Sequence, residues 1–249
     1  MDSRERLIVA LDQANTEDSE RLVHDLGDAV SFYKVNWVTL LSAGGSRLLQ
    51  TLRDKNKNIF LDLKIFDVPN TVREAVTAAA RMGVRFATVH GNKPMVEAAV
   101  SGRNAGRNGS SEPGLALLAV TALTSLTAGD VRTLYQVPEQ VSLADHVINV
   151  VRHMVAAGCD GVIASPQEVA RIRQEFPDRI LIVAPGIRMP GESTHDHKRP
   201  GYPYESIKEG ADYLVVGRSI YTDPDPKAKA EQYVKEIERG IRDRKSRGK

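Results

Sequence analysis

Three charged side chains gather at the end of one apolar run, with a spacing that suits proton transfer. Ile59 to Leu63 is almost continuously apolar, which is typical of a strand buried on both faces. Asp62 and Lys64 are two residues apart, so we expect both side chains on the same face of that strand. Asp67 follows after a short turn, and Pro69 marks the start of a helix. Such charges are costly to bury unless they are paired, so this strand end has the layout of a catalytic edge.

A salt bridge at the rim of a barrel is the alternative interpretation of an Asp-x-Lys pair, so the organisation of the chain matters. Short apolar runs alternate with longer amphipathic segments throughout. The runs predict strands at Leu7–Leu11, Phe32–Val35, Ile59–Lys64, Phe86–His90, Leu115–Thr121, Gly161–Ala164, Ile180–Val183 and Tyr213–Val216. The amphipathic segments predict helices at Thr16–Leu26, Leu40–Lys55, Thr71–Met82, Met95–Asn104, Ser142–Ala157 and Gln167–Phe176.

This alternation predicts an α/β fold, a (β/α)8 TIM barrel, with residues 1–249 forming a single domain. A doubly wound sheet is the main alternative. No G-x-G-x-x-G sequence opens a strand-to-helix turn, however, so the sequence lacks the dinucleotide-binding signature of that fold.

Polar residues follow the carboxyl ends of most of these strands, where barrels of this kind carry out their chemistry. They are Asp12, Lys34, the Asp62–Lys64–Asp67 set, His90, Thr121, Thr124, Pro185 with Gly186 and Arg188, and Gly217 with Arg218. Gly186 lets the backbone approach a ligand, and Gly217 opens a short helix whose free N–H groups favour an anion. Arg188 and Arg218 add forked donors, so we expect a phosphate at the loops after strands seven and eight, with a rim salt bridge as the alternative for Arg218.

The segment from Gly186 to Tyr204 is long, polar and rich in proline and glycine. Loops of this length in compact domains are usually lids or binding loops, although an ordinary variable excursion is the alternative.

Composition excludes several classes of protein. The formal net charge of +2 gives no case for nucleic acid or membrane binding, and no apolar run approaches membrane-spanning length. One cysteine, Cys159, cannot form an intramolecular disulfide or a cysteine-based metal site. The polar start, Met1 to Arg6, lacks the apolar stretch of a signal peptide, so we expect a cytoplasmic protein.

The chain resembles the orotidine 5'-monophosphate decarboxylase family from Leu7 to Tyr221. The most specific element is Asp62-x-Lys64-x-x-Asp67-Val68-Pro69-x-Thr71, supported by Ala119–Ser125, Pro185–Arg188 and Gly217-Arg218. The resemblance implies a (β/α)8 barrel that converts orotidine 5'-monophosphate to UMP, the last step of UMP synthesis, as a homodimer with shared active sites. It also implies no metal and no organic cofactor.

The resemblance also implies a role for each matched residue. Lys64 is the expected proton donor, and Lys34, Asp62 and Asp67 complete the charged network. Asp67 and Thr71 are expected to reach the site of the neighbouring subunit. Substrate contacts are expected from Asp12 and Lys34 to the ribose, Thr124 to the pyrimidine, and Arg188 and Arg218 to the phosphate, with Pro185 and Gly217 in the same binding loops.

One position departs from the family pattern. The family often has glutamine where this chain has His197. A neutral histidine also offers one donor and one acceptor, so we expect His197 to contact the substrate with a different pH dependence.

Elementary chemistry agrees with this assignment. Loss of CO2 from C6 of the pyrimidine leaves a carbanion with no aligned π system, so side chains must stabilise it. Lys64 suits this task because its ammonium both stabilises the negative charge and supplies the proton.

Two rival functions remain. A Mg²⁺-dependent sugar-phosphate decarboxylase or aldolase of the same superfamily would share Asp-x-Lys-x-x-Asp but lack the Pro-x-Thr continuation. A catalytically silent UMP-binding barrel would not need so costly a charge cluster.

Overall fold

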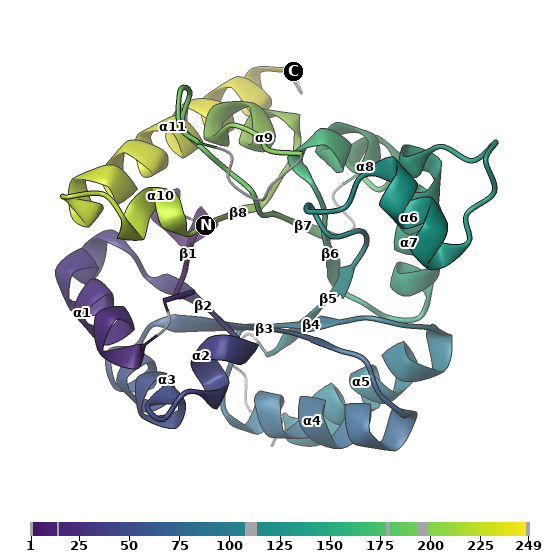
Figure 1. Cartoon of the computed structure of the whole chain (residues 1–249), viewed down its shortest axis with the longest axis horizontal. Coiled ribbons are helices and arrows are strands. Elements are labelled where there is room, and N and C mark those ends of the chain that lie inside the picture. Colours follow the sequence, from purple (N-terminus) through teal and green to yellow (C-terminus); the bar gives the residue numbers. More distant parts are fainter. Residues whose placement is uncertain (1, 14, 108–113, 178–179, 194–198, 248–249) are drawn as a thin grey trace.

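The computed structural model of the chain describes residues 2–13, 15–107, 114–177, 180–193 and 199–247. Over these residues eight parallel strands form a closed barrel in sequential order, and helices surround it (Figure 1). The predicted (β/α)8 fold is confirmed, with every strand boundary within one residue of its predicted position. The strands are β1 Leu7–Ala10, β2 Phe32–Asn36, β3 Asn58–Ile65, β4 Phe86–Val89, β5 Ala116–Val120, β6 Gly161–Ile163, β7 Leu181–Ala184 and β8 Tyr213–Val216.

The barrel is packed on both sides of its strands. Inside it, Phe32, Phe60, Phe86 and Tyr213 form an aromatic cluster, in which the rings of Phe86 and Tyr213 lie 4.9 Å apart. A larger apolar cluster fills the space between the strands and the outer helices. The near-continuous apolar strands are explained by this double burial, and the inner cluster forms a solid floor beneath the carboxyl ends of the strands.

The helices of the described chain follow the strands. They are α1 Thr16–Leu26, α2 Trp37–Leu41, α3 Gly45–Asp54, α4 Pro69–Arg81, α5 Lys93–Gly106, α6 Ala128–Tyr135, α7 Leu143–Ala156, α8 Val169–Glu175, α9 Pro203–Glu209, α10 Arg218–Tyr221 and α11 Pro226–Arg247, with short 3-10 turns η1 Arg4–Arg6, η2 Gly27–Ala29 and η3 Pro166–Glu168. Pro69 begins α4, as the sequence predicts.

The single helix predicted at Leu40–Lys55 is wrong, because the structure has two helices here. The Asn36 side chain accepts a hydrogen bond from the Thr39 N–H and so begins α2 directly after β2. The chain then turns at Ser42, which is extended, and α3 starts at Gly45. A Cβ at Gly45 would lie 2.3 Å from the Leu40 carbonyl oxygen, so only glycine allows this close turn.

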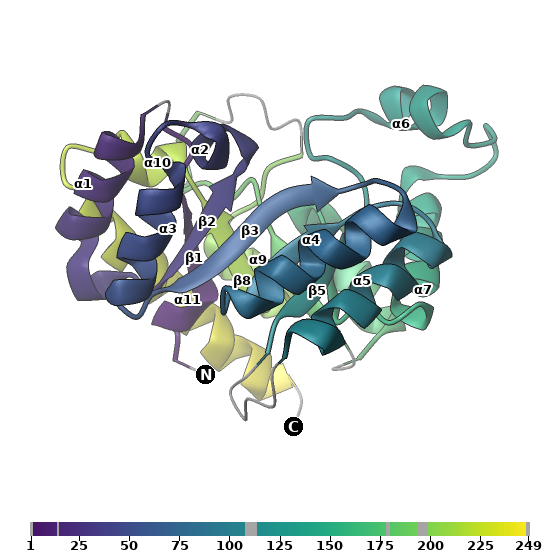
Figure 2. The same cartoon turned by 90° about the horizontal axis from the view of Figure 1, so that it is seen from below.

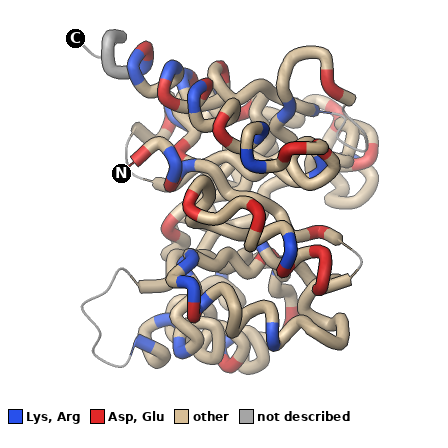
Figure 3. The backbone as a smooth tube through the Cα atoms, turned by 90° about the vertical axis from the view of Figure 1, so that its left-hand side faces the viewer, with Lys and Arg blue, Asp and Glu red and all other residues tan. Residues whose placement is uncertain are grey.

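The two ends of the barrel differ. In Figure 2, α2, α6 and α10 lie at the end to which β3 points, and both chain termini lie at the other end. Along the backbone seen in Figure 3, Lys and Arg positions are interspersed with Asp and Glu positions. Within the described residues, no helix has the length and apolar character needed to span a membrane.

Candidate active site

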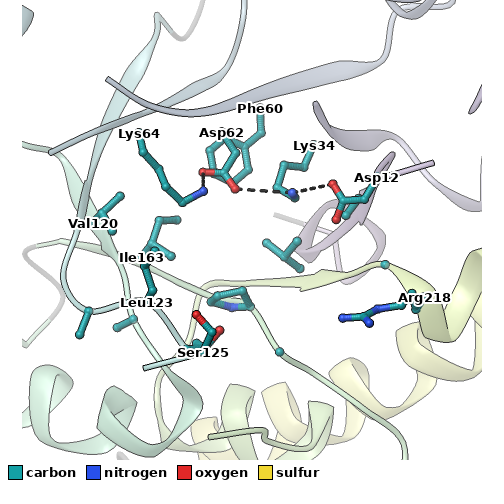
Figure 4. Close-up of a pocket in the computed structure, with 18 of the residues that line it drawn as sticks. Asp12, Lys34, Phe60, Asp62, Lys64, Val120, Leu123, Ser125, Ile163 and Arg218 are labelled. Carbon is teal, nitrogen blue, oxygen red and sulfur yellow. Dashed lines mark hydrogen bonds and ion pairs between the residues drawn. The ribbon is translucent and has the colours of Figure 1, made fainter. Parts of the chain in front are cut away.

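A cavity opens at the carboxyl ends of the strands, above the inner aromatic cluster (Figure 4). Residues within or directly after β1, β2, β3, β5, β6, β7 and β8 line it, although they are far apart in the sequence. Most of the predicted site residues meet here: Asp12, Lys34, Asp62, Lys64, Thr124, Pro185, Arg188, Gly217 and Arg218. The structure brings these nine residues together at one rim.

Along one wall, four charged side chains form a row of alternating sign (Figure 4). Lys64 Nζ lies 2.9 Å from Asp62 Oδ1, and Asp62 Oδ2 lies 3.5 Å from Lys34 Nζ. Lys34 Nζ in turn lies 2.9 Å from Asp12 Oδ1. Each inner member of the row has an opposite charge on both sides, which allows four charges to stand together in a partly buried place.

The middle of the row is the most buried part, and its protonation states follow from the pairing. Burial alone would lower the pKa of Lys34, but the carboxylates of Asp12 and Asp62 outweigh burial and raise it. Burial alone would raise the pKa of Asp62, but the charges of Lys34 and Lys64 and a hydrogen bond from Thr88 lower it. Both groups are therefore charged at neutral pH. The Lys64 side chain is 40% exposed, so the end of the row faces the open cavity.

A bulge in β3 produces the geometry of Asp62 and Lys64. The pairing of β3 with β4 shifts register between Leu61 and Ile65, and Lys64 has a left-handed backbone with φ 47°. Both side chains line the cavity, as expected. The sequence analysis attributed this to the regular alternation of side chains along a strand, which is wrong because the bulge interrupts that alternation between the two residues.

Sequence reasoning missed the residue that holds this bulge. Thr88 of β4 is fully buried, and its hydroxyl accepts a hydrogen bond from the Lys64 N–H at 2.8 Å. The same hydroxyl donates to Asp62 Oδ1 at 3.0 Å. A threonine within an otherwise apolar strand, Phe86-Ala87-Thr88-Val89, was the available signal. Asn36 was also missed, and it donates to Asp12 Oδ1 at 2.9 Å while capping α2.

The opposite wall comes from the loops after β5, β7 and β8. Leu123, Thr124 and Ser125 line the cavity after β5. Arg188 is buried after β7, where its guanidinium donates to the carbonyl oxygens of Ser193 and Ile187 at 3.0 Å and 2.8 Å. Burial, together with the nearby charge of Arg218, lowers the pKa of Arg188. Two guanidinium groups at one end of a cavity are suited to a dianion such as phosphate.

Two predicted glycines behave differently. Gly186 has φ 77°, a conformation that side chains rarely adopt, and its carbonyl oxygen accepts from the Gly201 N–H at 3.2 Å. Gly217 precedes the four-residue helix α10, as the sequence predicts, and its φ of −119° lies outside the left-handed region.

The remaining predicted residues lie elsewhere. Asp67 and Thr71 are exposed and do not line this cavity in their own chain, and the Asp67 carboxylate accepts from the Val68 N–H at 2.7 Å. His197 lies outside the described residues. His90, which directly follows β4, does not line the cavity but stacks on the ring of Tyr135 with 6.2 Å between ring centres.

Comparisons with known proteins identify the family of this chain. Residues 5–233 match the model of the orotidine 5'-phosphate decarboxylase / HUMPS family. The chain is 42% identical over 240 residues to orotidine 5'-phosphate decarboxylase of Nitrobacter winogradskyi, covering 96% of this chain and 95% of that protein. It is 43% identical over 229 residues to the protein of the same name from Methylococcus capsulatus, covering 92% and 90% of the two chains.

A solved structure is similar over the same length. Orotidine 5'-phosphate decarboxylase from Lactobacillus acidophilus superimposes with a TM-score of 0.80 at 37% identity, covering 94% of this chain and 99% of that one. The family match spans nearly the whole barrel and every residue of the charged row. The chain belongs to the orotidine 5'-phosphate decarboxylase / HUMPS family.

Proposed function

We propose that this chain decarboxylates orotidine 5'-monophosphate to UMP, the last step of pyrimidine nucleotide synthesis. The observation that carries the proposal is the row Lys64–Asp62–Lys34–Asp12 on one wall of a cavity that also holds Arg188 and Arg218. The two relatives and the solved structure described above bear the name of this enzyme.

The cavity suggests an orientation for the substrate. In Figure 4 Arg218 lies across the cavity from Lys64, so a nucleotide with its phosphate at Arg188 and Arg218 directs its base toward Lys64. Asp12 and Lys34 then contact the ribose, and Thr124 contacts the pyrimidine. His197 is proposed, from the sequence alone, as a further contact.

In the proposed reaction the C6–carboxylate bond breaks, CO2 leaves, and the electron pair stays on C6. The Lys64 ammonium stabilises this pair and then donates its proton to C6. One charge pair at about 4 Å and an effective dielectric near 20 is worth roughly 4 kcal/mol. That is about three decades of rate at ~1.4 kcal/mol each, so Lys64 does not act alone.

Asp62 supplies a second contribution. Its carboxylate is charged and lies beside Lys64, so the substrate carboxylate placed next to it is repelled before CO2 leaves. Binding of the remote phosphate holds the substrate in this arrangement, so the binding energy of the phosphate offsets the repulsion between the two carboxylates.

We propose a homodimer in which each site takes Asp67 and Thr71 from the neighbouring subunit. Both residues are exposed. Large apolar side chains are also exposed in α2, at Trp37, Val38 and Leu41, and beside Asp67, at Phe66 and Val68. Exposed apolar surface of this kind supports the proposed interface. The cytoplasmic location predicted from the sequence remains a prediction.

One assay tests the proposed activity. Purified protein in EDTA should remove the absorbance of orotidylate and form UMP. Activity that appears only when Mg²⁺ is added would favour a metal-dependent relative of the superfamily. UMP binding without turnover of orotidylate would favour a silent nucleotide-binding barrel.

A further inference from the structure

A buried ion pair lies beside the cavity but does not line it. Glu168, at the end of η3, pairs with Arg199 in the segment after β7. The two side chains are only 8% and 9% exposed. Neither residue belongs to the cavity wall, so neither touches a ligand there.

Arg199 connects this pair to the loop after β5. Its guanidinium donates to the carbonyl oxygen of Leu123 at 3.1 Å and to that of Ala122 at 3.4 Å. Ala122 and Leu123 both line the cavity and directly precede Thr124. The β5 loop is therefore held by two hydrogen bonds from one charged side chain.

The backbone around Arg199 is fixed to the phosphate side of the cavity. The Arg199 carbonyl oxygen accepts from the buried hydroxyl of Ser165 at 3.1 Å. Two residues later, Gly201 accepts from the Arg188 N–H at 2.9 Å. A Cβ at Gly201 would lie 2.2 Å from Pro166 Cβ, so this segment rests directly on η3. One continuous set of contacts thus joins the Leu123 carbonyl to Arg188.

Stability alone is a poor explanation for this pair. Buried ion pairs often stabilise a protein no better than apolar residues of similar size, because both charges lose their hydration. Glu168 and Arg199 are both buried, so the loss of hydration applies to both charges and points to a role other than stability.

We propose that Glu168 and Arg199 are positioning residues that couple the β5 loop, with Thr124, to the β7 loop, with Arg188. A phosphate bound by Arg188 fixes the position of the β7 loop. Through its hydrogen bonds to Ala122 and Leu123, Arg199 then also fixes the position of the β5 loop, which contacts the base. The inference rests on the proposed function and assigns a role to two residues outside its site.

The test compares orotidylate with orotidine, the nucleoside that lacks the phosphate. The ratio of kcat/KM for the two substrates measures how far phosphate binding assists the reaction at the base. In Arg199→Ala this ratio should fall about tenfold or more, corresponding to ~1.4 kcal/mol of lost coupling. Arg199→Lys keeps the charge and one donor group, so it should restore part of the ratio.

A matched control lies at the other end of the barrel. Arg173 pairs with Asp212 at 2.7 Å and donates to the carbonyl oxygens of Gly210 and Ile180 at 2.9 Å and 3.1 Å. It has the same kind of partners but no connection to the cavity. Arg173→Ala should lower the melting temperature and leave the ratio unchanged.

A second variant separates the change in the kcat/KM ratio from any change in stability. In the double variant Glu168→Met with Arg199→Met, an apolar pair replaces the charges, so the melting temperature should be maintained. The ratio should still fall, because the carbonyls of Ala122 and Leu123 lose their donor. A wild-type ratio in this folded variant, or an equal loss with both substrates, would overturn the inference. Absence of orotidylate turnover in the wild type would instead contradict the proposed function.

Discussion

Lys64 reaches Asp62 across 2.9 Å from a backbone in the left-handed region, with φ 47°. Such a conformation costs about 1–3 kcal/mol in a residue other than glycine, and it persists only where neighbouring contacts impose it. Here the Thr88 hydroxyl, bonded to the Lys64 N–H and to the Asp62 carboxylate, makes those contacts. The strain therefore lies at the residue to which we assign proton donation.

Replacement of Lys64 by alanine should abolish decarboxylation while the protein stays folded. The substitution removes both the stabilising charge and the proton, so kcat should fall at least about a hundredfold, or ~3 kcal/mol. Lys93→Ala is a suitable control, because Lys93 is exposed on α5, where it pairs with Glu97 at 3.6 Å. A Lys64→Ala protein that keeps more than about one hundredth of wild-type kcat would contradict the assigned role.

Thr88→Val should lower kcat although Thr88 does not touch the substrate cavity. Valine has nearly the same shape but leaves the Lys64 N–H without its acceptor and removes one of the two hydrogen bonds to Asp62 Oδ1, of which that from Lys64 Nζ remains. Loss of such buried hydrogen bonds costs about 1–3 kcal/mol. Thr88→Ser keeps the hydroxyl and should retain most activity. Equal kcat values for the valine and serine variants would show that the bulge does not depend on this hydroxyl.

The barrel was predictable from the sequence because each strand is a short apolar run bounded by polar residues. A strand that is buried on both faces needs apolar side chains on both, so its sequence is almost continuously apolar. The break between α2 and α3 was not predictable from periodicity, since Leu40 to Lys55 remains amphipathic across it. The helices are separated there because Asn36 caps the start of α2 and because the backbone of Gly45 lies close to the Leu40 carbonyl oxygen. Both features depend on three-dimensional contacts.

The site was predictable to the extent that it lies at strand ends. Parallel order brings those ends together whatever lies between them, so Asp12, Lys34 and Asp62 meet as expected. Thr88 and Arg199 were missed because their roles depend on hydrogen bonds to backbone groups of other segments. No spacing in the sequence records those bonds.

The shared site of the proposed homodimer can be tested by mixing two inactive variants. In a hybrid of Asp67→Ala and Lys64→Ala chains, one site carries both lesions and the other carries neither. If Asp67 serves the neighbouring subunit, equal mixing should restore about a quarter of wild-type activity, since about half of the dimers are hybrids with one intact site. No recovery after verified subunit exchange would mean that Asp67 serves its own chain.

Arg218→Ala should mainly raise KM for orotidylate, because its guanidinium is proposed to bind the phosphate. Some loss of kcat should accompany this change, since phosphate binding also holds the substrate in place. Orotidine lacks the phosphate, and its kcat/KM should change little. Arg21→Ala, on the exposed face of α1, is the control for loss of one positive charge. Equal damage with both substrates would remove Arg218 from the phosphate site.

Stability should decrease below neutral pH because of two histidines packed on Tyr135. The His90 ring stacks on Tyr135, and the ring centre of His146 lies 5.5 Å from that of Tyr135. Burial lowers the pKa of both histidines from the ordinary value near 6.5. The unfolded chain therefore binds more protons than the folded chain at and below about pH 6.5, and the stability present above this pH is lost as the pH falls.

The double variant His90→Gln with His146→Gln isolates this effect. Its melting temperature should decrease less between pH 7 and pH 5 than that of the wild type, since neither glutamine titrates. His24→Gln is the matched control, because the His24 side chain is 81% exposed and should leave the wild-type dependence intact. Parallel curves of melting temperature against pH for the wild type and the double variant would contradict the assignment. If the melting temperature decreases more steeply in the wild type than in the double variant, the acid sensitivity lies where the three rings bring α6 and α7 against the residue that follows β4.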